Sequence, residues 1–328
     1  MLKYLSLFSG IGAFESALTN LGVNYEVVNY CEIDKYASKS YSAIHGVPES
    51  KNLWDITKVN VFNLPKPGEI DLVTYGFPCQ DISLAGKQKG LFNEDGTLTR
   101  SGLFFEALKV IEYCKPKVAI AENVKNLTSK KFATQFETVL KSLEEAGYNN
   151  YWKVLNAKDY GIPQNRERVF IVSIRKDVDT ELFEFPKPYS LEKRLKDFLE
   201  LHVDEKYYLS DKSITTSDNM GVVVSEPINT MPDGTCRTLK NQYFKTSKAN
   251  FERTSTFGAT GVTNGLHIRK LTPRECYRLM GFSDAEFDRA EKVNSNTQLY
   301  KQAGNSVVVD VIEELFCMML DEKGDFYI

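Results

Sequence analysis

The first 175 residues alternate short apolar runs with stretches of helical periodicity. The apolar runs are rich in β-branched and aromatic residues, which is typical of buried strands. They cover residues 4–8, 26–30, 70–75, 118–121 and 169–174. Strands that alternate with helices pair in parallel in a doubly wound sheet, and ligands gather at the carboxyl ends of such strands. We therefore expect an α/β domain with its binding site at that edge of the sheet.

One helix is predicted together with both of its ends. Thr134 and Glu137 have the spacing of a capping box, and Gly147 stands where a C-terminal cap belongs. Between them, apolar residues recur at helical spacing: Phe136, Val139, Leu140 and Leu143. The pattern predicts a helix over residues 134–147.

The pattern changes at residue 186. From there to about residue 268 the chain is richer in Ser, Thr, Asn and Gly, apart from a predicted helix near residues 191–201, and we expect a second domain here. Two helices are predicted to close the sequence. One begins at Thr272-Pro273 with Glu275 as capping partner and ends at Gly281. The other, residues 306–320, is strongly apolar and is expected to be buried against the first domain.

Composition predicts an ordinary globular protein. The 328 residues are 42% hydrophobic and 26% charged, enough for a large core in one large domain plus a smaller one. Because the sequence has neither a secretory signal pattern nor an 18-residue apolar run, we expect a cytoplasmic protein without membrane attachment. Six scattered cysteines and only three histidines argue against a metal site and a disulfide framework.

Charge is distributed unevenly. The net charge is -3, yet residues 234–270 contain seven basic residues against the single acid Glu252, or 7 − 1 = +6. A basic segment on an acidic body is typical of a local nucleic-acid contact. The alternative is a solvated loop whose lysines serve solubility.

The segment from Leu7 to Leu18, LFSGIGAFESAL, predicts a strand, a glycine turn and a helix. Gly10 and Gly12 allow a close approach to a ligand, but Glu15 replaces the third glycine of a dinucleotide-binding turn and would repel a pyrophosphate. Glu32 lies at the predicted end of the next strand, where a carboxylate commonly holds ribose hydroxyls. The pattern favours S-adenosylmethionine over a dinucleotide.

Cys79 follows Pro78 at the end of an apolar run, in the sequence TYGFPCQDIS. Proline restricts its own backbone and that of Phe77, so the thiol is held in one direction. About twenty residues without periodicity follow, which is typical of a lid. Cys79 is therefore a candidate nucleophile, with a buried structural cysteine as the alternative.

Two further motifs lie at predicted strand ends. Glu122 follows the strand over residues 118–121 and is a candidate proton donor, or else an N-cap. In QNRER, Arg166 and Arg168 precede a strand, and alternation would send both to one side, within reach of a polar ligand or of surface acids.

Taken together, GFPCQ, ENV, QNRER, the turn SGIG and the late YKQAGNSVVVDVI resemble the DNA (cytosine-5) methyltransferases, in the family's order from residue 4 to about 315. The size is similar to that of small bacterial modification enzymes of the HhaI type. The resemblance implies a Rossmann-like doubly wound mixed sheet, the S-adenosylmethionine-dependent methyltransferase fold. It also implies a discontinuous catalytic and cofactor-binding domain, residues 1–185 plus 301–328, and a small target-recognition domain, residues 186–300.

The resemblance assigns chemical roles as well. The Cys79 thiolate would add to carbon 6 of a flipped cytosine so that carbon 5 takes the methyl group. Glu122 would bind the N3 and N4 edge and protonate N3. Arg168 would hold O2, with Arg166 supporting the site.

Cofactor contacts are implied for eleven residues. Glu32 is expected at the ribose, and Ile33 and Ile56 at the adenine faces, with Asp55 at its amino group. The full set is Phe8, Gly10, Gly12, Glu32, Ile33, Asp55, Ile56, Pro78, Leu103, Asn305 and Ser306.

The implied partner is double-stranded DNA, read by a variable segment at residues 211–267. DNA contacts are expected from Gln80, Ser83, Lys87, Lys89, Arg237, Lys240, Lys245, Lys248 and Arg253. We expect a monomer, with a cognate restriction endonuclease as a candidate partner. The alternatives are an RNA methyltransferase on the same core, a silent DNA-binding regulator and a nucleotide-dependent dehydrogenase.

Overall fold

The computed structural model describes residues 1–79, 81–82, 90–93, 95–208, 226–228, 230–231, 233–245, 259–263, 268–321 and 325–327. The chain forms two compact units. Unit 1 comprises Met1–Asn156, Glu167–Lys187 and Val311–Ile328, and unit 2 comprises Ala157–Arg166 and Pro188–Asp310. The expected division into a catalytic domain and a target-recognition domain stays a prediction, since compactness alone assigns no function.

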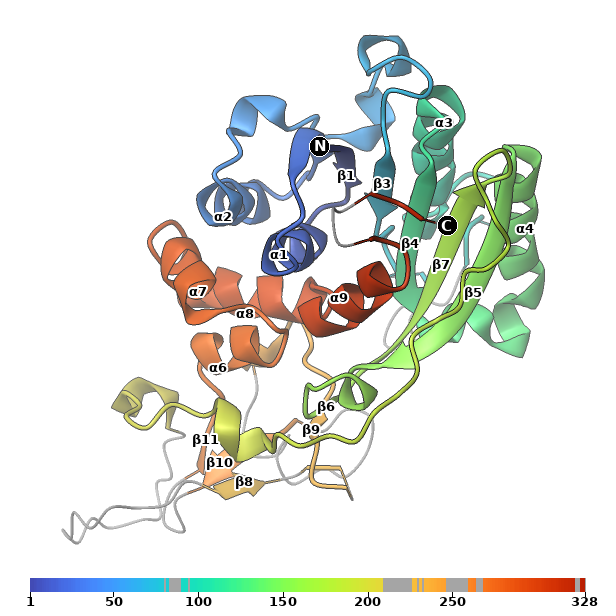
Figure 1. Ribbon diagram of the computed structural model, residues 1–328. Coiled ribbons are helices and arrows are strands. Elements are labelled where there is room, and N and C mark those ends of the chain that lie inside the picture. Colours follow the sequence, from blue (N-terminus) through green and yellow to red (C-terminus); the bar gives the residue numbers. More distant parts are fainter. Residues whose placement is uncertain are drawn as a thin grey trace, which may run out of the picture. The chain divides into compact units, whose positions relative to one another are not determined.

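Unit 1 is built on a six-stranded sheet in the order β2-β1-β3-β4-β7-β5 (Figure 1). The strands are β1 (Leu2–Leu7), β2 (Tyr25–Cys31), β3 (Leu72–Tyr75), β4 (Val118–Val124), β5 (Tyr148–Asn156) and β7 (Glu167–Arg175). The first four in spatial order are parallel, whereas β7 runs antiparallel to both β4 and β5. The predicted α/β class and mixed sheet are thus confirmed.

Helices cover both faces of this sheet. They are α1 (Ala13–Asn20), α2 (Lys35–His45), α3 (Phe104–Cys114) and α4 (Ala133–Glu145). Figure 1 shows α3 and α4 along one face and α1 on the other. The core between the layers includes the fully buried side chains of Leu5, Val73 and Ala119. Apolar residues are therefore removed from water on both faces of the sheet, as expected for parallel strands.

The end of the chain belongs to unit 1. Helix α9 (Val309–Cys317) leads into it, with Ile312, Leu315 and Phe316 fully buried. The Phe316 ring packs edge-on against Phe14 of α1, with centroids 6.3 Å apart. The prediction that the apolar last helix is buried against the first domain is confirmed.

Unit 2 is built from shorter elements. A three-stranded antiparallel sheet has the order β11-β10-β8, and β6 pairs in parallel with β9. These strands are β6 (Gln164–Asn165), β8 (Glu226–Ile228), β9 (Cys236–Arg237), β10 (Gly261–Thr263) and β11 (Ile268–Arg269). The helices are α6 (Pro273–Arg278), α7 (Asp284–Glu291) and α8 (Asn296–Asn305).

Helix α6 begins with the predicted capping box, formed by Thr272 and Glu275. The Glu275 carboxylate also accepts hydrogen bonds from both Nη atoms of Arg269, each at 2.8 Å. The Glu275 side chain is 0% exposed and that of Arg269 is 1% exposed. The backbone N–H of Glu200 donates to the same carboxylate at 2.9 Å. The buried ion pair thus joins β11 to α6, and the Glu275 carboxylate also holds the segment that contains Glu200.

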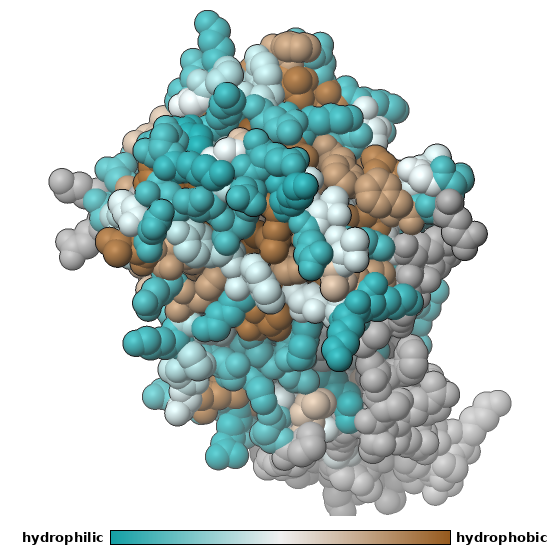
Figure 2. All heavy atoms as spheres, turned by 90° about the vertical axis from the view of Figure 1, so that its right-hand side faces the viewer, coloured by the Kyte–Doolittle hydropathy of each residue, from teal (hydrophilic) through white to brown (hydrophobic). Residues whose placement is uncertain are grey.

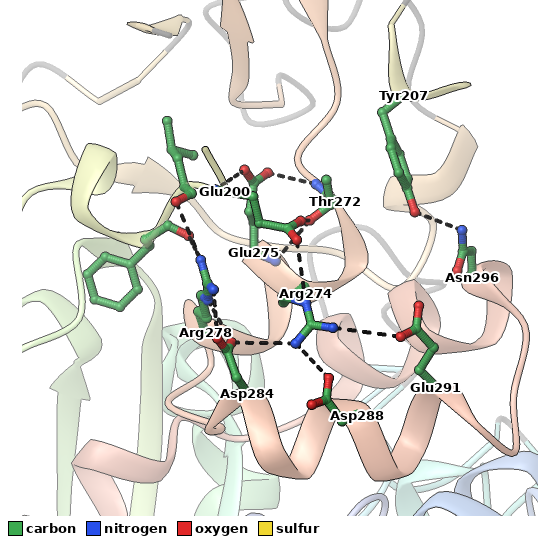
Figure 3. Close-up of polar contacts among 12 residues, drawn as sticks. Glu200, Tyr207, Thr272, Arg274, Glu275, Arg278, Asp284, Asp288, Glu291 and Asn296 are labelled. Atoms are coloured by element: carbon green, nitrogen blue, oxygen red, sulfur yellow. Dashed lines mark hydrogen bonds and ion pairs between the residues drawn. The ribbon is translucent and has the colours of Figure 1, made fainter. Parts of the chain in front are cut away.

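Arg274 lies on the outer side of α6, among four acids (Figure 3). Its nitrogen atoms lie 2.7 Å from Asp288, 3.4 Å from Glu200, 3.7 Å from Glu291 and 3.9 Å from Asp284. Its guanidinium also stacks over the Phe287 ring, 4.4 Å from the centroid. One arginine thereby connects α6 with most of α7.

Two local predictions are wrong. A 3-10 turn, Lys130–Phe132, runs directly into α4, so Phe132 is the N-cap and Thr134 lies inside the first turn without forming a capping box. Residues 191–201 form only a 3-10 turn, Leu195–Phe198, in place of the expected helix. The N–H of Glu200 there bonds to Glu275, so a tertiary partner replaces a helical one.

The face of the molecule on the α4 side is mostly hydrophilic, with small separate hydrophobic areas (Figure 2). Strand β5 forms an edge of the sheet, and its Trp152 remains 46% exposed while packing on Phe136. Within the described ranges no helix is long and apolar enough to cross a membrane, and no three metal-ligating side chains cluster.

Candidate active site

The turn between β1 and α1 has an unusual backbone. Phe8, Gly10 and Gly12 all have positive φ angles, of 53°, 58° and 84°. A side chain at Gly12 would meet His45, whose Nε2 would be 2.1 Å away, whereas the position above Gly10 is open. Glycine at position 12 is thus required by both backbone angle and space.

The Glu32 carboxylate closes this turn. Its Oε2 accepts from the backbone N–H of Gly10 at 2.9 Å, and its Oε1 accepts from that of Asp34 at 2.7 Å. Glu32 follows β2, which pairs with β1, so the carboxyl ends of two neighbouring strands bring turn and carboxylate together. The sequence-based pairing of Gly10 with Glu32 at one site is seen directly.

Asn52 organises the same region, and the sequence reasoning did not find it. Its carboxamide accepts from the N–H of Glu32 at 3.0 Å and from that of Trp54 at 2.8 Å, and donates to the Glu32 carbonyl at 3.0 Å. Asn52 is only 7% exposed. No local signal marks it, because its partner lies 20 positions earlier in the chain.

Two large apolar side chains flank Glu32 at the surface. Ile33 is 70% exposed and Trp54 is 40% exposed, while Ile56 is buried. Asp55 accepts hydrogen bonds from the hydroxyl and N–H of Thr57, which lower the pKa of its carboxyl group. Of the residues expected around an adenine ring, Ile33 is thus exposed, Asp55 is half-buried and Ile56 is buried.

Cys79 lies in a loop fastened to the end of β4. Asn123 donates from Nδ2 to the carbonyl of Phe77 at 3.0 Å, and the Gly76 backbone faces Glu122, whose Oε2 would lie 3.6 Å from a side chain there. The Cys79 carbonyl accepts from the N–H of Ile82 at 3.0 Å. All six cysteines are described and none forms a disulfide, and Cys79 is half-buried.

The loop after Cys79 is closed at its base by Asp81. The Asp81 carboxylate accepts from the N–H of Arg100 at 3.1 Å, and its carbonyl accepts from that of Gly90 at 2.8 Å. Both ends of the predicted lid are thereby held together. Four residues expected to contact DNA here lie outside the described residues: Gln80, Ser83, Lys87 and Lys89.

Glu122 and Arg168 form an ion pair. Nε of Arg168 lies 2.8 Å from Oε1 of Glu122, and the side chains are 17% and 13% exposed. Strands β4 and β7 pair antiparallel, with Val124 opposite Arg168. Glu122 is two residues before Val124 on the same face of β4, so its side chain lies beside that of Arg168. The structure thus joins the second arginine of QNRER to the acid of ENV.

Arg166 has different partners. Strand β7 begins only at Glu167, so the alternation expected to align Arg166 with Arg168 does not apply. Arg166 is 3% exposed, and its guanidinium donates to the carbonyls of Leu239, Gly304 and Ser306.

Four further residues expected at the cofactor belong to different units. Asn305 is exposed and Ser306 is buried, both in unit 2, whereas Pro78 and Leu103 are half-buried in unit 1.

Comparison with known proteins identifies the family. The model of the C-5 cytosine-specific DNA methylases matches residues 2–320. The chain belongs to this family. It is 35% identical to type II methyltransferase M2.ScrFI of Lactococcus lactis subsp. cremoris, covering 96% of this chain and 98% of that protein. It is 36% identical to type II methyltransferase M.HhaI of Haemophilus parahaemolyticus, covering 95% and 92%.

A solved structure, the Entamoeba histolytica methyltransferase EhMeth, superimposes with a TM-score of 0.72 over 97% of each chain at 19% identity. This likeness confirms the methyltransferase fold. The protein is accordingly a DNA (cytosine-5) methyltransferase by family, and the predicted family resemblance is confirmed.

In this methylase the predicted base-reading segment is described only in part. Arg237 and Lys240 are half-buried and Lys245 is exposed, whereas Lys248 and Arg253 lie outside the described residues. Burial and the neighbouring Arg237 lower the pKa of Lys240. Arg269, counted in the local charge of +6, is sealed against Glu275, so the positive charge at the surface is smaller than the sequence suggested.

Proposed function

We propose that this methylase transfers a methyl group from S-adenosylmethionine to carbon 5 of a flipped cytosine at a specific DNA sequence, through a covalent adduct with Cys79. The observation that carries the proposal is the Glu122–Arg168 ion pair beside the loop of Cys79. The residues just before Cys79 lie against the end of β4, which supports one site for the nucleophile and for the acid with its cationic partner. That is the set of groups that activation of a cytosine ring requires.

The residues around the glycine turn fit S-adenosylmethionine. The Glu32 carboxylate is a hydrogen-bond acceptor held against the turn by the backbone N–H groups of Gly10 and Asp34, and ribose hydroxyls are donors that suit it. The exposed Ile33 and Trp54 offer apolar surface for an adenine ring. Oε2 of Glu15 would lie 3.1 Å from a side chain at Gly12, so an acid sits directly beneath the turn and disfavours a pyrophosphate. Bound there, the cofactor supplies an electrophilic methyl group.

The first chemical step is the addition of the Cys79 sulfur to carbon 6. An ordinary thiol has a pKa of about 8.5, so only a few per cent is thiolate at neutral pH, and Cys79 must lose its proton to solvent before it adds. The acid is needed at the ring, because the electron pair that the sulfur brings raises the basicity of N3. Glu122 protonates N3 as the carbon–sulfur bond forms. Arg168, which binds the same carboxyl group, stabilises the carboxylate that remains.

The second step uses the electron density that addition creates. Carbon 5 would take the methyl group of an S-adenosylmethionine held by the glycine turn and Glu32, whose sulfur would keep the electron pair of the broken bond. A base then removes the proton from carbon 5, the electrons restore the double bond to carbon 6, and the Cys79 thiolate leaves. The proton on N3 returns to the Glu122 carboxylate, so the enzyme is restored. Arg168 is also proposed to hold O2 during both steps.

Carbon 6 is out of reach inside a stacked duplex, so the cytosine must rotate out at a cost of about a few kcal/mol. The loop after Cys79, with its base tied by Asp81, is proposed to cover the extruded base. Double-stranded DNA is the proposed substrate, bound by a monomer. A cognate endonuclease stays a prediction.

Methyl transfer from labelled S-adenosylmethionine to a mixed-sequence duplex tests the proposal, with tRNA as the competing substrate. We expect label in the duplex, at cytosine carbon 5. Cys79→Ser should abolish transfer while cofactor affinity is retained, and Cys317→Ser, at an exposed cysteine, should leave transfer unchanged. Label in tRNA alone, or transfer by Cys79→Ser, would contradict the proposal.

A further inference from the structure

The first half of the QNRER motif fastens a segment of the predicted base-reading region. The N–H of Cys236 donates to the carbonyl of Pro163 at 2.7 Å, and β9 then pairs with β6. The Thr238 hydroxyl donates to the carbonyl of Asn165 at 2.5 Å. All of these contacts lie within unit 2. Hydrogen bonds from the backbone and from the Thr238 side chain thus hold this segment at successive residues.

Gln164 and Arg166 complete the fastening from either side of Leu239. Oε1 of Gln164 accepts from the Leu239 N–H at 3.1 Å, and Nη1 of Arg166 donates to the Leu239 carbonyl at 3.0 Å. These side chains are 0% and 3% exposed. Buried polar groups that are satisfied in this way hold a backbone in one arrangement.

The same two side chains reach the helices of unit 2. Nε2 of Gln164 donates to the carbonyl of Leu279 at the end of α6, at 2.7 Å. Nη2 of Arg166 donates to the carbonyls of Gly304 and Ser306 at the end of α8. Gln164 and Arg166 therefore connect the segment Cys236–Leu239 to the ends of α6 and α8.

Close packing supports the same arrangement. A side chain at Gly304 would meet the backbone of Lys240 and Asn241 at 2.3 Å. No residue larger than glycine fits there without displacing backbone, so α8 lies directly against the chain that follows Leu239. The position of Lys240 is thus set by packing as well as by hydrogen bonds.

The fastened segment carries two cations, Arg237 and Lys240. Burial, and after it the positive charge of Arg237, lowers the pKa of Lys240. Holding two cations together in a half-buried place is favourable when an anion such as a DNA phosphate binds them. The observation points to DNA rather than to the cofactor as the ligand of this segment.

We propose that Gln164 and Arg166 are positioning residues for DNA recognition, which hold the segment Cys236–Lys240 in the conformation that reads the duplex. This inference rests on the proposed function. It assigns the two arginines of one motif to separate tasks. Arg168 pairs with Glu122 in unit 1 and serves the chemistry, whereas Arg166 donates to three backbone carbonyls in unit 2 and serves recognition.

The test maps methylation of a random-sequence duplex library by bisulfite sequencing, for the wild type, Arg166→Lys and Thr238→Val. Lysine keeps the charge but cannot reach three carbonyls, and valine removes only the hydroxyl that bonds to Asn165. Thr138→Val is the matched control, because Thr138 also donates its hydroxyl to a carbonyl, that of Thr134 in α4. Thermal unfolding of each variant shows that it is folded, and Thr238→Val keeps the test decisive should Arg166→Lys unfold.

We expect Arg166→Lys and Thr238→Val to methylate a broader set of sequences and to raise the KM for DNA, by about tenfold for the arginine change, with the KM for S-adenosylmethionine unchanged. Thr138→Val should keep the wild-type pattern. An unchanged sequence pattern and DNA KM in a folded variant, or a loss confined to kcat, would overturn the inference. Absence of methylation by the wild type itself would overturn the proposed function, and the inference with it.

Discussion

At the scale of single residues, the edge proposed to bind the cofactor is organised by two side chains, Asn52 and His45, to which no ligand contact is assigned. Asn52 holds the backbones of Glu32 and Trp54, and Glu32 in turn holds Gly10. A bond from His45 Nε2 to the Ile11 carbonyl, 2.9 Å long, supports the turn from behind. The arrangement of the turn and of Glu32 therefore depends on partners to which no chemical role is assigned.

Replacement of Asn52 by leucine should weaken cofactor binding. The variant leaves the N–H groups of Glu32 and Trp54 without their acceptor, so we expect the KM for S-adenosylmethionine to rise by about tenfold or more while kcat changes less. Asn60→Leu is the matched control, because Asn60 caps an exposed turn by accepting from the N–H of Phe62. Equal cofactor KM values for both variants and the wild type would contradict this role of Asn52.

Asp233 predicts a pH dependence of stability in unit 2. Burial opposes its ionisation, but hydrogen bonds from Lys158, at 2.7 Å, and Thr235 outweigh burial and lower its pKa to about 2 from an ordinary value of 3.8. A lowered pKa in the folded state stabilises the fold above the unfolded pKa and loses this effect as pH falls.

The measurement compares the free energy of unfolding of Asp233→Asn and the wild type between pH 6 and pH 2. The wild type should be more stable above about pH 5, and the difference should shrink as pH falls from about 4 toward 2. A difference that grows as pH falls would show that the carboxylate is not stabilised as the contacts indicate.

At the scale of elements, the sequence predicted what short-range patterns determine. The apolar runs that became β1, β2, β3, β4 and β7 were recognised, and so was the capping box of α6. Strand β5 was missed because its sequence, YNNYWKVLN, has no clear alternation and lies at the edge of the sheet. The helix expected near residues 191–201 failed because Glu200 bonds to Glu275, 75 positions away.

The candidate site shows the same limit. Strand ends predicted Cys79 and Glu122 at one edge of the sheet, the family resemblance added Arg168, and the structure shows Glu122 and Arg168 in contact. The sequence did not reveal that Arg166 binds the Leu239 carbonyl, because no sequence pattern indicates which distant carbonyls a buried guanidinium contacts. Local chemistry was predictable, and long-range partners were not.

The ion pair that joins β11 to α6 predicts a large effect on stability. Glu275→Gln leaves the Arg269 guanidinium buried without its carboxylate, so we expect a loss of about 3–5 kcal/mol in the free energy of unfolding. Lys109→Gln is the control: it breaks a pair with Glu106 that has the same 2.8 Å separation but a lysine side chain that is 60% exposed. That control should cost less than about 1 kcal/mol.

Denaturant unfolding measures both variants. Similar losses for the buried and the exposed pair would contradict the account, because they would show that burial does not decide the strength of these contacts.

At the scale of the whole molecule, each unit is assembled from distant parts of the chain. Unit 1 takes three segments and unit 2 takes two, and the QNRER motif crosses from one unit to the other between Arg166 and Glu167. Five consecutive residues thus connect the segment proposed to read DNA with the arginine proposed to act on cytosine. Residues Arg166 and Arg168, which belong to different units, are thus separated by a single residue of the chain.

Covalent trapping on a duplex with 5-fluorocytosine tests the central claim most directly. Fluorine at carbon 5 cannot leave as a proton, so after methyl transfer the Cys79 adduct should persist and appear as a protein–DNA complex that survives denaturation. The complex should require S-adenosylmethionine, form with Cys317→Ser and be absent with Cys79→Ser. An enzyme that methylates ordinary duplex DNA yet forms no such complex, or forms it with Cys79→Ser, would contradict the account.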